Sequence, residues 1–171
     1  MTKQTDRRTF LAAAGATAAT VALAGCSSGD NGDGDNGDGD NGDGDNGDVS
    51  VPDEVDSYLS DALNYDGSAE DLREQDEITI DVGAGDSGLA FDPAAVVVTP
   101  GTEVEWAWTG QGGAHNVVSA DSSDTEFDSG DTVDSDSETF YQTFDEPGNN
   151  MYYCNPHEGA GMLGAVIVQE A

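Results

Sequence analysis

Three side chains that can bind a transition metal fall within nine residues near the carboxyl end of the chain. The stretch CNPHEGAGM supplies the thiol of Cys154, the imidazole of His157 and the thioether of Met162. The only other histidine, His115, lies upstream in the segment AHNVVS. Thiolate and thioether suit Cu(I), whereas imidazole suits Cu(II), so this set can hold copper in both oxidation states.

Two imidazoles and a thiolate in one plane, with a distant axial thioether, form the arrangement of blue-copper electron-transfer sites. A thiol enzyme would need a third group to orient its histidine, and it would leave Met162 without a role. Multicopper oxidases and copper nitrite reductases need additional histidines, and the chain has only two. Structural zinc sites use thiolates and imidazoles, and thioether is a poor ligand for zinc.

We therefore expect one copper ion and a protein that carries single electrons and has no substrate to transform. The alternative is a protein that stores or delivers copper without transferring electrons. A delivery site should be open, so that its ligands exchange easily. Three candidate ligands on one short loop between strands indicate a closed site, which favours the electron carrier.

The elements that must position these ligands are predicted to be strands. From Glu77 onward, short segments rich in β-branched and aromatic residues alternate with Gly, Pro, Asp and Ser. Pro100-Gly101 fits a turn that joins two antiparallel strands. The pattern predicts an all-β Greek-key sandwich. The expected strands are EITIDV, AAVVVT, EVEWAW (with Val104, Trp106 and Trp108 on one face), HNVVS, TFYQTF, MYYC and GAVIVQ.

A short amphipathic helix is predicted before the strands, over residues 52–65. Val55, Tyr58, Leu59, Ala62 and Leu63 recur at helical spacing, so they would form one apolar face. Pro52 suits the first turn of such a helix. We expect the helix to cover one side of the domain.

The amino-terminal part of the chain is predicted to target and tether the protein. Residues 1–25 read as a twin-arginine lipoprotein signal, because RRTFL precedes an apolar run and LAGC places Cys26 at a lipidation site. Residues 26–50 are expected to form an extended acidic tether, because residues 29–48 are four copies of GDNGD without any apolar residue that could build a core. We expect residues 51–171 to form the folded domain and Cys26 to anchor it at the extracellular face of the cell membrane.

The charge of the chain argues against nucleic acid as a partner. The chain has 36 acidic and 4 basic residues, a net charge of −32. Removing residues 1–25 takes away one acid and three bases, so 35 acids remain against Arg73 alone, a net charge of −34. Such a chain should repel nucleic acid, because phosphate binding needs Lys or Arg. Self-repulsion of this size is relieved only in concentrated salt, which indicates a halophilic protein.

The ligand loop resembles that of plastocyanin-type cupredoxins, with Cys-x-x-His-x-x-x-x-Met spacing and a Pro before His, and AHNVV resembles their upstream ligand segment. The chain also resembles membrane-anchored blue copper proteins of haloarchaea. The resemblance includes the segment FDPAAVVVTPGTEVEWAWTG, the acidic strands, the lipidation motif LAGC and the tether. The resemblance covers residues 51–171. It implies that His115, Cys154, His157 and Met162 are the copper ligands and that the backbone amide of Asn116 lies near the Cys154 sulfur. The helical segment 52–65 is absent from plain plastocyanins.

Electron exchange would need one ligand near the surface. His157 lies in PHEGAG, a stretch without bulky side chains. We expect its ring edge to reach the surface, flanked by Ala160 and Leu163 as a small apolar docking patch for membrane-bound redox proteins that act as donor and acceptor. We expect the protein to be a monomer.

Overall fold

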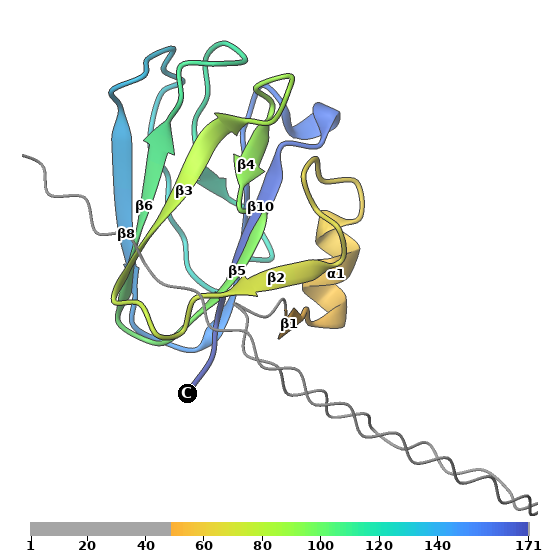
Figure 1. Cartoon of the computed structure of the whole chain (residues 1–171), viewed down its shortest axis with the longest axis vertical. Helices are drawn as coiled ribbons and strands as arrows, with labels where there is room; N and C mark the ends of the chain where they lie inside the picture. Colours follow the sequence, from red (N-terminus) through yellow and green to blue (C-terminus); the bar gives the residue numbers. More distant parts are fainter. Residues whose placement is uncertain (1–48, 171) are drawn as a thin grey trace, which may run out of the picture. The chain divides into compact units, whose positions relative to one another are not determined.

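The computed structural model describes residues 49–170, which form two β-sheets packed face to face (Figure 1). This arrangement confirms the expected all-β sandwich. Within this range no helix has the length and apolar content needed to cross a membrane. The four-stranded sheet has the order β4 (Ala90–Asp92), β3 (Glu77–Ala84), β6 (Thr102–Trp108), β8 (Thr139–Phe144). The six-stranded sheet has the order β1 (Val49–Ser50), β2 (Ser68–Asp71), β5 (Ala95–Val98), β10 (Leu163–Val168), β9 (Gly148–Tyr153), β7 (Val118–Ser119).

The main core lies between the sheets, and β6 shows how the sequence builds it. Alternate residues of β6 are buried, and Val104, Trp106 and Trp108 point inward as expected. The Trp106 indole stacks on Phe127 with ring centroids 5.5 Å apart. It also meets the Tyr152 ring of β9 edge-on at 5.3 Å, which joins the two sheets.

The six-stranded sheet is covered on its second face by α1 (Asp53–Leu59). Every residue of β10 is buried. Val166 and Val168 belong to the core between the sheets, while Ala165 and Ile167 pack with the helix. This double coverage explains why the sequences of β5 and β10 are continuous apolar runs rather than alternating ones. Burial of Val55 and Leu59 of α1 contributes about 1.5–3 kcal/mol each.

The predicted helix over residues 52–65 is too long. It begins directly after Pro52, with acidic residues in its first turn, but it ends at Leu59. Asn64 has a φ of 66°, a left-handed conformation that cannot continue a helix. The side chain of Leu63 is consequently 38 % exposed instead of joining the apolar face.

The predicted antiparallel pairing of β5 with β6 is wrong. The turn itself is present, because Thr102 N–H donates to Thr99 O at 3.2 Å and Gly101 has a φ of 94°. The turn leads from one sheet to the other, however, so β5 pairs in parallel with β10 and β6 pairs with β3 and β8. The expected strand HNVVS is reduced to β7, and β1, β2 and β4 were not expected.

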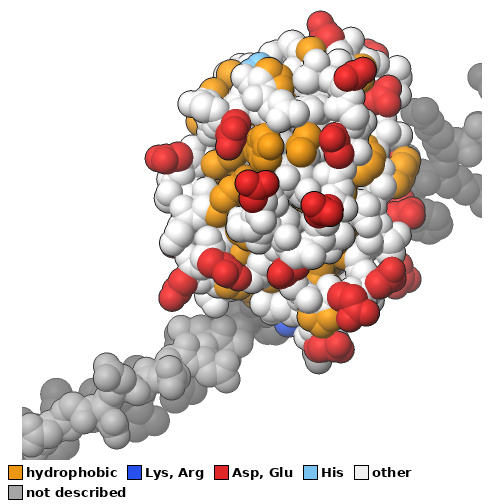
Figure 2. Space-filling model, turned by 180° about the vertical axis from the view of Figure 1, so that it is seen from behind, with side chains coloured by type: hydrophobic (Ala, Val, Ile, Leu, Met, Phe, Trp, Pro, Cys, Tyr) orange, Lys and Arg blue, Asp and Glu red, His pale blue; other side chains and the backbone are white. Residues whose placement is uncertain are grey.

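Acidic side chains cover the surface of the domain. They are spread over the whole face seen in Figure 2, where a small patch of histidine lies among hydrophobic side chains. Within residues 49–170 the one ion pair joins Arg73 to Asp71. The remaining acids therefore repel one another without local compensation.

We predict that salt stabilises this fold. The Debye length falls to about 3 Å at 1 M salt, so repulsion between surface carboxylates is screened. The melting temperature should rise between dilute and molar potassium chloride. A melting temperature that stays constant or falls would contradict a halophilic role of the acidic surface.

Candidate metal centre

The loop between β9 and β10 carries three of the four candidate ligands, as predicted. It spans residues 154–162 and contains a short 3-10 turn, η1 (Glu158–Ala160), drawn in blue at the upper end of the sandwich in Figure 1. His115 comes from the segment before β7, where it forms an isolated antiparallel bridge with Val133. Two segments far apart in sequence therefore meet at one end of the sandwich.

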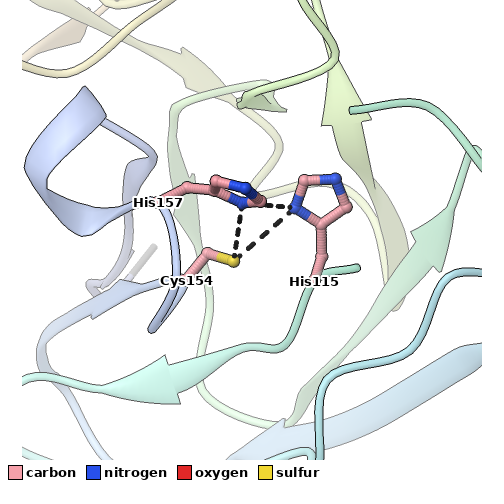
Figure 3. A group of neighbouring side chains, drawn as sticks. All are labelled: His115, Cys154 and His157. Atoms are coloured by element: carbon pink, nitrogen blue, oxygen red, sulfur yellow. Dashed lines mark hydrogen bonds between the residues drawn. The ribbon is translucent and has the colours of Figure 1, made fainter. Parts of the chain in front are cut away.

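The side chains of His115, Cys154 and His157 point toward one another (Figure 3). The Cys154 Sγ lies 3.6 Å from His115 Nδ1 and 3.5 Å from His157 Nδ1. The two Nδ1 atoms are 3.1 Å apart. Three ligand atoms thus form a nearly equilateral triangle.

The triangle has the size that a single metal ion requires. A point equidistant from the three atoms lies roughly 2.0 Å from each, which is close to the usual metal–imidazole bond of about 2.0–2.1 Å. The donor set of two imidazoles and a thiolate, all aimed at one point, fits copper.

Several groups that sequence reasoning missed hold the His115 ring. Its Nε2 lies 2.7 Å from the carbonyl oxygen of Gln111, so Nε2–H donates there and Nδ1 is left for a metal. The indole N–H of Trp108 donates to His115 O at 3.1 Å. Gly83, with a φ of 87°, leaves space for the contact between His115 Nε2 and Gln111 O. A Cβ at this position would lie 2.5 Å from Gln111 O and 3.2 Å from His115 Nε2.

Burial lowers the pKa of His115, which is 1 % exposed, and this shift favours the neutral form of the ring that binds metals. Burial also raises the pKa of the Cys154 thiol. The backbone N–H groups of Asn116 and His157 lower this pKa and so oppose the rise.

Met162 lies at the end of the loop and is fully buried, in the same core cluster as Cys154 and Trp108. Its carbonyl oxygen accepts a hydrogen bond from Cys154 N–H at 3.1 Å. Its own N–H donates to His157 O at 3.2 Å. The backbone of Met162 thus closes the loop that carries Cys154 and His157.

The surface above the site is formed by only part of the expected patch. His157 is half-buried and Ala160 is exposed. Leu163, the first residue of β10, is 9 % exposed and packs with α1, so it adds little to the surface.

Comparison with known proteins relates the chain to copper proteins. The model of the copper binding proteins of the plastocyanin/azurin family matches residues 78–169. Halocyanin of Natronomonas pharaonis is 52 % identical over 98 % of this chain and 99 % of its own length. Plastocyanin of Scenedesmus fuscus is 32 % identical over 54 % of this chain and its full length. Oxidised plastocyanin of Dryopteris crassirhizoma, a solved structure, is 25 % identical over 54 % of this chain and its full length, with a TM-score of 0.46.

We predict that Gly83→Ala displaces His115 and weakens copper binding about 10- to 100-fold, as losses of supporting contacts usually do. Gly85→Ala is the matched control. Gly85 also has a positive φ, 74°, but a Cβ there meets only the Cβ of Ala90, at 3.7 Å. Competition titration with a copper chelator measures both variants. Equal affinities would show that the contact between Gly83 and the His115 ring is unimportant.

Proposed function

The chain belongs to the plastocyanin/azurin family of copper-binding proteins, and from this membership we propose which of its residues hold the metal and where it works. The protein is a blue copper electron carrier with one copper ion. The triangle of His115, Cys154 and His157 is the observation that carries this conclusion. Bound copper supplies reversible one-electron exchange, which suits a ligand set shared between Cu(I) and Cu(II) preferences.

In the proposed site His115, Cys154 and His157 are the strong ligands and Met162 is the weak axial one. The complete burial of Met162 beside Cys154 and its backbone pairing with that residue support this role. The Asn116 backbone amide lowers the pKa of the Cys154 thiol, and we propose that it tunes the reduction potential by stabilising negative charge on the sulfur. Burial of His115, Cys154 and Met162 excludes water from the ligands.

Storage or delivery of copper remains the second candidate function, but the geometry favours the carrier. Three of the four proposed ligands are at most 1 % exposed, so an incoming acceptor has little access to them. Proteins of the halocyanin and plastocyanin type are electron carriers and generally not enzymes. We infer that this chain has no catalytic activity of its own.

Redox partners would dock over His157. This ligand is the one that reaches the surface, and the exposed Ala160 lies beside it on η1. We propose that membrane-bound redox proteins approach here as donor and acceptor.

We also propose that the protein is exported and held at the outer face of the membrane by lipid on Cys26. This residue and the signal segment 1–25 lie outside the described residues. Support comes from RRTFL and LAGC in the sequence and from similarity to halocyanin that extends over 98 % of the chain.

The ligand set is tested by contrasting a strong ligand with the weak one. Cys154→Ser should abolish the intense visible thiolate-to-copper band, because a hydroxyl is a weak, hard donor. Met162→Leu should keep the band and raise the potential, and Met162→Gln should lower it, since an oxygen donor favours Cu(II). Spectroscopy and voltammetry measure these effects. A visible band unchanged in Cys154→Ser would refute the copper site. A reduction potential that is unchanged in both Met162 variants would exclude Met162 as a ligand.

The docking surface is tested by adding a charge. Ala160→Asp should slow electron exchange with an anionic oxidant such as hexacyanoferrate(III) about tenfold, because a like charge at the contact site lowers the association rate. The visible spectrum should not change. The control is Gln75→Asp, which adds the same charge on the exposed loop before β3, at the opposite end from Gly83. Equal rates in the two variants would place docking elsewhere.

The anchor is tested with Cys26→Ser in the native host. Most of the protein should move from the membrane fraction to the soluble one, because the lipidated residue is lost. The copper spectrum should be retained. Continued membrane association would exclude Cys26 as the anchor.

A further inference from the structure

The segment that follows α1 contacts the ligand loop directly. Leu63 N–H donates to the carbonyl oxygen of Gly161 at 2.8 Å. The backbones approach so closely that a Cβ on Gly161 would overlap the carbonyl oxygen of Asp61. In Figure 1 the yellow loop after α1 rises beside β10 toward the blue turn η1. A part of the chain outside both sheets therefore touches the loop that carries three proposed ligands.

The contact falls between two of those ligands. Gly161 follows η1, has a φ of 88° and donates its N–H to Glu158 O at 2.9 Å. The next residue, Met162, donates its N–H to His157 O at 3.2 Å. Fixing Gly161 therefore fixes the turn that sets His157 relative to Met162.

The helix α1, from which this segment continues, is held in place independently of the ligand loop. Val55 and Leu59 of α1 are fully buried against the six-stranded sheet. The Tyr58 hydroxyl donates to the carbonyl oxygen of Tyr152 on β9 at 2.9 Å. The segment can thus transmit the rigidity of the sheet to the ligand loop.

We propose that residues 58–63 act as a clamp on the ligand loop, with Leu63 a positioning residue that acts through its backbone N–H. The clamp slows opening of the loop and hence the loss of copper. This inference rests on the proposed ligands His157 and Met162. If Leu63 only covered the ligand loop, its side chain would have to pack against that loop. The side chain is 38 % exposed, so Leu63 holds the loop mainly through its backbone N–H.

The clamp is tested in the full chain with Leu63→Pro, which removes the N–H donor, and with Leu63→Ala, which keeps it. In copper-free protein, amide hydrogen exchange of residues 154–163 should become roughly three- to tenfold faster in Leu63→Pro than in Leu63→Ala, as expected for one lost hydrogen bond. In copper-loaded protein, transfer of copper to an excess of chelator should accelerate by a similar factor. Exchange in β3 and β6 should be the same in the two variants.

Equal loop exchange and equal copper release in the two variants would overturn the proposal. A wild-type protein that binds no copper would refute the proposed function instead, while the exchange measurement on copper-free protein would still decide the clamp.

A second comparison covers the case in which Leu63→Pro does not fold. Gly161→Ala adds a methyl that overlaps Asp61 O, whereas Gly159→Ala adds one into open space on the same loop. Because Gly161→Ala also strains a positive φ, it is combined with Tyr58→Phe, which releases the segment from β9. A clamp predicts non-additive effects on loop exchange, since the freed segment can yield to the methyl. Additive effects, or equal exchange in Gly161→Ala and Gly159→Ala, would contradict it.

Discussion

The metal centre depends on one constraint: two loops distant in sequence must be held together at the end of the sandwich. The side chain of Asn116, which is 2 % exposed, supplies this link. Its Oδ1 accepts a hydrogen bond from Asn155 N–H at 3.0 Å, and its Nδ2 donates to Gly130 O at 3.2 Å. Breaking these bonds would leave buried polar groups without hydrogen-bond partners, which costs about 1–3 kcal/mol of free energy for each group. The residue beside His115 thus fixes the residue beside Cys154.

The two sheets make this link rigid. β9 and β10 flank the ligand loop and are antiparallel neighbours, so the loop starts and ends on paired strands. β10 is buried on both faces, by the opposite sheet and by α1, and cannot shift without disturbing both. Cys154 N–H and Met162 O then continue the pairing of these strands into the loop. Ligand geometry is in this way a consequence of strand pairing.

The features that could be predicted from the sequence are those that depend on the type and spacing of side chains. The ligand spacing predicted the loop 154–162, and the alternation in β6 predicted its buried face. The end of α1, the change of sheet at Pro100-Gly101 and the roles of Gly83 and Gln111 were not predictable in this way. These features depend on backbone carbonyls and on close approaches between distant segments, which leave no periodic pattern in the residues. A glycine inside a strand pattern often marks a close approach of another backbone, so Gly83 after EITIDV is the one signal in the sequence that could have been noticed.

Closure of the site bears on what the protein can pass to a partner. A metal ion can leave only if the loop opens, and opening breaks the bonds of Asn116 and of Leu63 together with the burial of Cys154 and Met162. An electron needs only proximity, and the half-exposed ring of His157 provides it without any ligand leaving its place. A structure that keeps one ligand at the surface and resists opening of the rest is suited to exchanging electrons while retaining its metal. The contact between the α1 segment and Gly161 adds to this resistance, which gives the helix a role beyond covering the sheet.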